Sequence, residues 1–398
     1  MENDTQRGVL PAESFFIEPL DVLVFRGNKL FGAPGSFGEN QMPPWPSVVA
    51  GALRTHMLDL AGVSLSDFMA QSGSEKGSYA SDEIVESLGT VAHPGRFAVT
   101  WFSLGRRTNS GTIERLFPLP HDLFIIKDGK EKRKIVPVVP IGPDDLRGVA
   151  TNAVLPWLPS LLLSSQSKGE SGFFLGEEGF LDYLAGRIPD PSALVHQSEL
   201  WGIDPRVGIG LDVSSRTASE GRLFSSETIA LKSGVGFVVD VVGASGLIAK
   251  KALLRFGGDG RAAHMEKIES FKRKGASLSK GNRFRLVMTT PGIFSHGPYP
   301  VSPEGPAPLV DGGPVVRLLS ASVGRSQTVS GWDLARRVPK AAQKAVPVGS
   351  VYWFQVVEGD PSRLNDDASA AGASFLEGLS RDRVSEGYNR GLITPWLS

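Results

Sequence analysis

The stretch that decides the fold runs from residue 14 to residue 60 and reads SFFIEPLDVLVFRGNKLFGAPGSFGENQMPPWPSVVAGALRTHMLDL. β-branched and aromatic residues crowd its first part, 14–25, which predicts a buried strand interrupted at Pro19. Glycines and prolines at 32–46 disfavour regular structure. Pro46 and the serine after it favour a helix start, because proline is tolerated in the first turn and serine can cap it. We therefore expect a strand, a glycine-rich loop and a helix.

The predicted helix has an apolar face and a second face that carries a glycine and an arginine. At about 100° per residue, the first face comprises Val49, Leu53, His56, Met57 and Leu60, and the second comprises Gly51, Arg54, Thr55 and Leu58. Glycine allows close backbone approach and arginine grips phosphate through parallel N–H donors. Together they indicate an anionic ligand near the helix start. The alternative is that Gly51 eases helix packing and Arg54 forms a surface ion pair.

Length and composition bound the class of protein. At 398 residues the chain exceeds one ordinary core, and we expect two domains, residues 1–200 and 201–398. Lys and Arg total 42, as do Asp and Glu, so any nucleic-acid site must be a local basic patch and not a result of net charge. The 47 glycines and 28 prolines predict many turns between short strands.

The sequence contains no cysteine, which excludes disulfides, thiolate catalysis and cysteine zinc sites and fits a reducing compartment. Its first residues lack the pattern of a secretory signal, and no apolar run approaches the roughly 18 residues of a membrane span. We therefore expect a soluble protein of the cytoplasm that does not meet a membrane.

Two hairpins are predicted from their turns. Asp128-Gly129 stands between two apolar runs, which is typical of a tight hairpin, and the lysines and arginines around it form either a solvated tip or a binding surface. A second pattern over 207–242 predicts a meander of three strands. The loop between its first two strands, DVSSRTASEGR, carries Arg216 and Arg222. It is long for a hairpin, which indicates a flexible element that can wedge into a nucleic-acid strand.

The most basic region lies between residues 250 and 285, with eleven Lys and Arg against three acids. This concentration is typical of phosphate-backbone binding. Within it, GGDGR places Gly257, Gly258 and Arg261 after a predicted strand, where backbone N–H groups can hold a phosphate or a nucleobase edge. The turn is neither a P-loop nor a dinucleotide fingerprint, because GxxxxGK[ST] and a helix-opening GxGxxG are absent.

A second basic segment, 325–344, has five bases and one acid, and contains Trp332. The indole can act as a stacking surface for unpaired bases, or it can be an anchor in the core.

The sequence gives less support for a catalytic function. The six histidines show no metal-ligand spacing, and neither a GxSxG elbow nor a carboxylate pair is present. We expect no catalytic residue, no metal and no cofactor.

A resemblance to a known family rests on six runs of residues in order: FIEPLDVLVFRGNKLF with MPPWPSVVAGALR, LFPLPHDL, RVGIGLDVSSRTASEGRLFSSE, LRFGGDGRAA and GWDLARRVPKAAQKAVPVGSVYWF. The chain resembles the RAMP-superfamily proteins that form the third subunit of the type III-B CRISPR effector, the Cmr complex. The resemblance implies an α+β fold of two ferredoxin-like (RRM-like) domains with insertions and long β-hairpins. It also implies a noncatalytic RNA-binding protein of antiviral defence.

The resemblance further implies what the protein binds. The expected ligand is the 5′ repeat-derived handle of the CRISPR RNA, and the expected partners are the large polymerase-like subunit and the backbone subunits of the complex. The RNA contacts that it implies are Arg26, Arg54, Arg216, Arg222, Gly257, Gly258, Arg261, Arg336, Arg337 and Lys340. The terminal loop at 387–391 departs from the family's pattern of small residues, because it carries Tyr388, Asn389 and Arg390.

Two other functions stay open at this point. Some RAMP proteins are metal-independent endoribonucleases that process CRISPR precursor RNA, and His264 or His56 would then act as the general base. His56 lies on the apolar helix face, as a core histidine would, and no partner for His264 is visible in the sequence. The other reading is a purely structural assembly subunit whose basic patches meet acidic protein surfaces.

Overall fold

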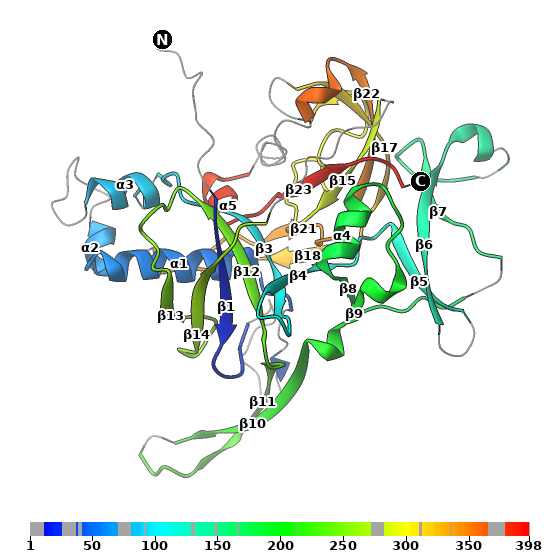
Figure 1. The fold of residues 1–398 in the computed structure, drawn as a ribbon. Helices are drawn as coiled ribbons and strands as arrows, with labels where there is room; N and C mark the ends of the chain where they lie inside the picture. The colour runs from blue at the N-terminus through cyan, green and yellow to red at the C-terminus, as the bar shows by residue number, and fades with distance from the viewer. Residues whose placement is uncertain are drawn as a thin grey trace.

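The computed structural model describes residues 12–25, 37–38, 42–70, 81–90, 93–128, 132–146, 148, 150–164, 167–212, 214–271, 282–309, 313–334, 336–364 and 379–397. Helices are few in these residues and the sheets are mostly antiparallel (Figure 1). None of the described helices is long and apolar enough to cross a membrane.

The largest sheet has eight strands in the order β13-β14-β1-β12-β3-β4-β8-β9. In chain order they are β1 (Glu13–Pro19), β3 (Ala98–Arg107), β4 (Ile113–Pro118), β8 (Phe173–Leu175), β9 (Leu194–His196), β12 (Val235–Val242), β13 (Lys251–Arg255) and β14 (Ala262–Ile268). The predicted strand over 14–25 is confirmed as far as Pro19, but after the expected interruption it does not resume, and Leu23 forms only an isolated bridge to Ile229. Both neighbours of β1 pair with it antiparallel, so strands from distant parts of the chain meet in one sheet.

Three helices lie beside this sheet, with α1 packed across its strands: α1 (Pro46–Leu60), α2 (Leu65–Ala70) and α3 (Asp82–Leu88) (Figure 1). The predicted helix is therefore confirmed as α1. The expected faces were wrong at two positions, since Leu58 is 5% exposed and Leu60 is 56% exposed. Leu58 belongs to the same buried cluster as Ile84 and Leu88 of α3, because α3 covers the side of α1 that sequence periodicity had assigned to solvent.

A second sheet lies wholly after residue 282, in the order β16-β17-β22-β15-β23. Its strands are β15 (Arg283–Met288), β16 (Ala307–Pro308), β17 (Val315–Ser322), β22 (Val351–Glu358) and β23 (Gly391–Thr394). Aromatic side chains such as Phe284, Tyr352 and Phe354 fill its own core. A further apolar cluster joins Trp101 and Phe180 to Trp353, so the two sheets share buried contacts.

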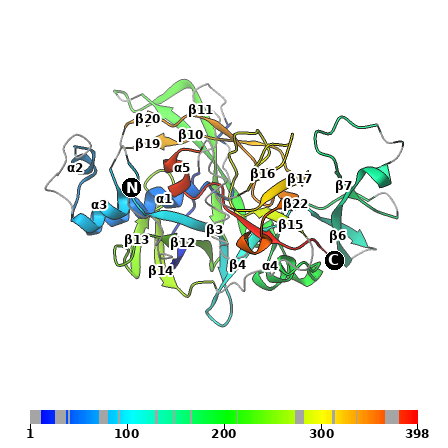
Figure 2. The ribbon, with the colours of Figure 1, turned by 90° about the horizontal axis from the view of Figure 1, so that it is seen from above.

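Smaller elements surround the two sheets. A three-stranded sheet combines β5 (Leu123–Asp128), β6 (Lys132–Ile141) and β7 (Leu158–Leu161), which confirms the strands of the first predicted hairpin; its turn, with Gly129, lies outside the described residues. Short helices are α4 (Glu177–Leu184), α5 (Arg381–Ser385) and 3-10 turns at Pro143–Leu146, Pro191–Ala193, Gln197–Glu199 and Pro361–Leu364. Two two-stranded pairs complete the C-terminal part: β18 (Gln327–Val329) with β21 (Gln343–Ala345) (Figure 1), and β19 (Trp332–Asp333) with β20 (Val338–Pro339) (Figure 2).

The second predicted hairpin is a long arm. β10 (Trp201–Leu211) and β11 (Ala218–Leu231) pair antiparallel and project from the body of the molecule (Figure 1). β2 (Phe37–Gly38) adds a short parallel pairing at Ser225 and Ser226. β12, the third strand of the predicted meander, pairs with β1 and β3 in the eight-stranded sheet and not with β11, so the prediction of a meander is confirmed for its first two strands and wrong for the third.

The division at 200–201 does not coincide with the boundary of a sheet. β12, β13 and β14 follow residue 201 but complete the sheet that β1 and β3 begin. The first core therefore draws on both halves of the sequence. The division into two ferredoxin-like domains stays a prediction.

Candidate nucleic-acid interface

The expected RNA contacts fall into two groups, and the first surrounds residues 21–25, the segment that follows β1. On one side, the Leu23 N–H donates to the carbonyl of Ile229 at 2.8 Å, and the Ile229 N–H donates back at 2.9 Å. On the other side, the Gly258 N–H donates to the carbonyl of Val24 at 2.8 Å. The segment is thus held between the base of the β10–β11 arm and the glycine-rich turn.

The first glycine of the glycine-rich turn, Gly257, is explained by its backbone conformation and its close neighbours. Gly257 has φ +85°, and a Cβ there would meet Phe25 Cε1 and the Val24 oxygen, each at 3.3 Å. Only glycine fits this conformation at this distance. Because the Gly258 N–H is already bonded to Val24, it is not available to hold a phosphate in this arrangement. Arg261 forms an ion pair with Asp21 and remains partly exposed, and Arg26, the residue that follows the segment, lies outside the described residues.

The far end of the arm carries Arg216. This residue is exposed, has φ 52°, and donates its backbone N–H to the carbonyl of Asp212 at 2.9 Å. The Asp212 carboxylate orders the turn, because it accepts from the Ser214 N–H and the Ser215 N–H, each at 2.9 Å. Hydrogen bonds from the Ser214 side chain, and then from the two backbone N–H groups, lower the pKa of Asp212 to about 2. Arg222 lies in β11, but its side chain is outside the described residues.

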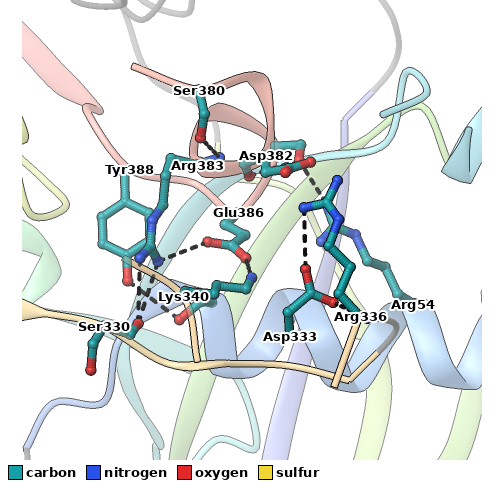
Figure 3. A network of polar contacts seen from close by, with 12 residues as sticks. Arg54, Ser330, Asp333, Arg336, Lys340, Ser380, Asp382, Arg383, Glu386 and Tyr388 are labelled. Carbon is teal, nitrogen blue, oxygen red and sulfur yellow. Dashed lines mark hydrogen bonds and ion pairs between the residues drawn. The ribbon is translucent and has the colours of Figure 1, made fainter. Parts of the chain in front are cut away.

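The second group joins residues that are far apart in the sequence. Arg54 comes from α1, Arg336 and Lys340 come from the β19–β20 hairpin, and all three lie beside α5 in one polar network (Figure 3). Lys340 forms an ion pair with Glu386, whose side chain is 2% exposed. Arg383 Nη1 lies 3.2 Å from the other oxygen of Glu386. The structure therefore brings together three of the expected contacts around a set of carboxylates, of which Glu386 is buried.

Arg54 is not a surface residue. Its Nη2 donates to the Ser385 hydroxyl at 2.6 Å, and its guanidinium lies 5.7 Å from the centre of the Phe97 ring. Burial lowers the pKa of Arg54, while the charges of Glu386, Asp382 and Asp333 oppose that shift. Gly51 is exposed, and a Cβ there would meet no described atom within 4 Å. Both parts of the alternative interpretation, helix packing at Gly51 and a surface ion pair at Arg54, are therefore wrong.

Arg337 is a further expected contact, and it lies with Arg336 at the end of the β19–β20 hairpin. Arg336 and Arg337 are exposed, and Arg337 has φ 54°. The Arg336 N–H donates to Asp333 Oδ1 at 2.9 Å, and its Nη1 lies 3.4 Å from Asp333 Oδ2. Trp332 is 56% exposed, so the interpretation of this residue as a core anchor is wrong.

The two histidines considered as bases have different surroundings. His56 is 8% exposed, and its Nε2 accepts from the Ala249 N–H at 3.4 Å. Burial lowers the pKa of His56. His264 is exposed on β14, opposite Leu253 and Glu18. Within the described residues, no three His, Asp or Glu side chains form a group that could hold a metal ion.

The residues that α5 supplies to the network were missed by sequence reasoning. Asp382, Arg383 and Glu386 belong to α5 and its end, and a five-residue helix is too short to show periodicity. One signal was available, because Ser380 precedes RDRVSE and caps the helix by accepting from the Arg383 N–H at 3.4 Å. A serine followed by such alternating charges indicates a short charged helix.

Comparison with solved structures finds chains of similar size. A chain of "Cryo-EM structure of the Type III-B Cmr-beta bound to cognate target RNA and AMPPnP, state 1" has 15% sequence identity and a TM-score of 0.47, with 94% of this chain and 95% of that chain covered. A chain of "Crystal structure of Csm3-Csm4 subcomplex in the type III-A CRISPR-Cas interference complex" has 9% identity and a TM-score of 0.35, with 87% and 92% covered.

Sequence comparison gives a family. No curated protein matches the chain. A family model does match, over residues 15–396, which is nearly the whole sequence, and its description is "CRISPR-associated protein (Cas_Cmr3)". The RAMP resemblance inferred from the six sequence runs is thereby confirmed, and the chain belongs to the Cas_Cmr3 family of CRISPR-associated proteins.

Proposed function

We propose that this protein is a noncatalytic RNA-binding subunit of a type III-B CRISPR ribonucleoprotein in the cytoplasm. It holds the 5′ repeat-derived handle of the CRISPR RNA and docks the large polymerase-like subunit and the backbone subunits of the Cmr complex. Membership of the Cas_Cmr3 family supports the assignment to the complex.

The observation that carries the RNA-binding part is the second group of cations. Arg54, Arg336 and Lys340 converge from separate segments on one surface beside α5 (Figure 3). Clustered cations in a chain of zero net charge are typical of a phosphate-binding patch. Exposed Arg336, with Arg337 beside it, reaches the phosphates of the RNA directly, whereas half-buried Arg54 holds α5 in place through Ser385.

The first group supplies a second contact region in this proposal. Arg261 flanks the segment that leads to Arg26, and exposed Arg216 lies at the end of the projecting arm. Gly257 and Gly258 then act by setting the path of the turn and not by binding phosphate. Arg222, on the strand of the same arm, completes the set.

The test is a titration of labelled repeat-handle RNA with the full-length chain at about 50 and about 200 mM salt. Binding that weakens with salt and leaves the RNA intact is expected. The double variant Arg336→Ala, Arg337→Ala should bind less tightly, and its salt slope should fall by about 0.7 for each phosphate that the variant no longer neutralises. Arg187→Ala is the matched control, because Arg187 is an exposed arginine paired with Asp182 on α4.

Three results would contradict the proposal in different ways. Metal-free cleavage of the RNA would favour the endoribonuclease. Binding that is insensitive to salt would favour the assembly subunit, because phosphate contacts weaken when counterions are plentiful. Unchanged binding in the double variant, with normal salt dependence, would place the RNA on another surface.

A further inference from the structure

The β19–β20 hairpin exposes large apolar side chains from its base to its turn. Trp332 is 56% exposed, Leu334 61% and Val338 46%. Trp332 pairs across the hairpin with Pro339, so the two side chains project from the same face of the hairpin. A large exposed aromatic ring in this setting is a surface available for contact.

The base of the same hairpin is firmly held. Arg383, which is 4% exposed, donates to the carbonyl of Ser330 from both Nη1 and Nη2 at 3.5 Å and to the carbonyl of Ala341 from Nη2 at 3.4 Å. Ser330 precedes β19 and Ala341 follows β20, so the Arg383 guanidinium is hydrogen-bonded to the residues on both sides of the hairpin. The Lys340 N–H closes the base by donating to the Gly331 carbonyl at 2.8 Å.

The ion pairs of the network add to this support. Lys340 is joined to buried Glu386, and Glu386 also contacts Arg383 (Figure 3). The base of the hairpin is therefore fixed to α5, while its end projects into solvent. A ring on a fixed support loses little freedom when a ligand stacks on it, which favours binding.

The charges around the indole indicate the kind of ligand. Arg336 and Arg337 are exposed on the turn of the same hairpin. The one acidic residue of the hairpin, Asp333, is bonded to Arg336. An exposed indole beside two cations complements an unpaired nucleobase and the phosphates on either side of it. An acidic protein surface would match the cations but would leave the indole without a flat partner.

We propose that Trp332 is a base-stacking site for single-stranded RNA, presented by the β19–β20 hairpin and held in place by Arg383. This inference rests on the proposed function, because it names the part of the RNA that one surface of the protein recognises. Stacking is tolerant of base identity, since every base has a flat face. Trp332 therefore fixes the position of an unpaired nucleotide and does not read its sequence.

The test uses the full-length chain and a single-stranded RNA of about ten nucleotides. Each nucleotide in turn is made abasic, which removes the base and keeps the phosphate. For the wild type, one abasic position should weaken binding about 5- to 100-fold. Trp332→Ala should weaken binding of the intact RNA by the same factor and should no longer distinguish that abasic RNA from the intact one. Trp332→Phe, which keeps a ring, should restore most of the affinity.

Leu334→Ala is the matched control, because it removes a similarly exposed apolar side chain from the same hairpin. It should bind both RNAs as the wild type does. If Trp332→Ala and Leu334→Ala weaken binding equally, or if Trp332→Ala still responds to the abasic position, the stacking site is wrong and the RNA-binding function stands. If the wild type fails to bind any of these RNAs, the proposed function fails as well.

Discussion

Two residues of α1 show how burial acts on basic side chains whose ordinary pKa values differ. Burial lowers the pKa of both Arg54 and His56. Arg54 starts from 12.5 and has three carboxylates nearby, so it remains charged at neutral pH. His56 starts from 6.5, so the same effect keeps its imidazole neutral and lets Nε2 accept from Ala249. One helix thus supplies a permanent cation to the polar network and an uncharged acceptor to the core.

A pH dependence of stability follows from His56. Its pKa is lower in the folded state than in the unfolded state, so the unfolded state binds more protons as pH falls through 6.5. The free energy of unfolding should therefore decrease between about pH 7 and about pH 5. His56→Gln should show a smaller decrease, measured by urea unfolding across this range. Some dependence should persist, because burial also lowers the pKa of His121. Identical pH profiles for the two proteins would contradict this account of His56.

The β10–β11 arm is an element whose end depends on one side chain. Asp212 accepts from two backbone N–H groups and from the hydroxyls of Ser214 and Ser215. The base of the arm is held separately, through Leu23 and Ile229. The two ends of the arm should therefore respond independently to a change in the turn.

Asp212→Ala should loosen the turn only. The Ser214 and Ser215 amides should exchange with solvent about tenfold faster, while the Leu23 and Ile229 amides should keep their rates, as measured by hydrogen exchange with NMR. The wild-type turn should loosen in the same way as pH falls below 3.8 towards 2, because the lowered pKa of Asp212 means that its stabilising effect is lost on protonation. Asp204→Ala, on the same arm, is the control, and an effect of equal size from it would exclude Asp212 as the cause.

Elements with strong local signals could be predicted from the sequence, and distant pairings could not. The strand, the start of α1 at Pro46 and the hairpin strands around residue 128 depend on turn chemistry and propensity within a short window. The place of β1 between β12 and β14 depends on packing between residues far apart, which no window contains. The same contrast holds for the site, because the cations Arg54 and Lys340 stand out by charge, whereas the buried carboxylate of Glu386 is recognised only once α5 is in place.

At the scale of the whole molecule, a buried ion pair joins the second sheet to the elements around the first. Arg285 of β15 pairs with Asp122, and both side chains are fully buried. Tyr183 of α4 donates to Asp122 at 2.7 Å, and Arg285 Nε donates to the Pro395 carbonyl at 2.8 Å. Four separate segments therefore meet at one guanidinium, which makes the C-terminal part fold together with the rest.

Removal of Asp122 should show how much the buried ion pair contributes to the free energy of unfolding. Asp122→Ala leaves Arg285 buried without its carboxylate and should lower the free energy of unfolding by about 3–5 kcal/mol. Asp182→Ala is the matched control on neighbouring α4, where Asp182 pairs with Arg187 at the surface and both are exposed. It should cost less than about 1 kcal/mol. Both values come from denaturant unfolding. Equal losses of stability would mean that the buried pair does not join the second sheet to the rest of the protein.

The order of strands in the first sheet has a consequence for synthesis of the chain. β1 is translated long before β12 and β14, the two strands that cover its edges. A nascent chain that ends before residue 235 carries a strand of apolar residues with both edges unpaired, which is a template for aggregation. Chaperone capture of ribosome-bound chains should therefore end only when the ribosome has passed residue 268, and truncated translation products should be cleared and not accumulate as folded fragments.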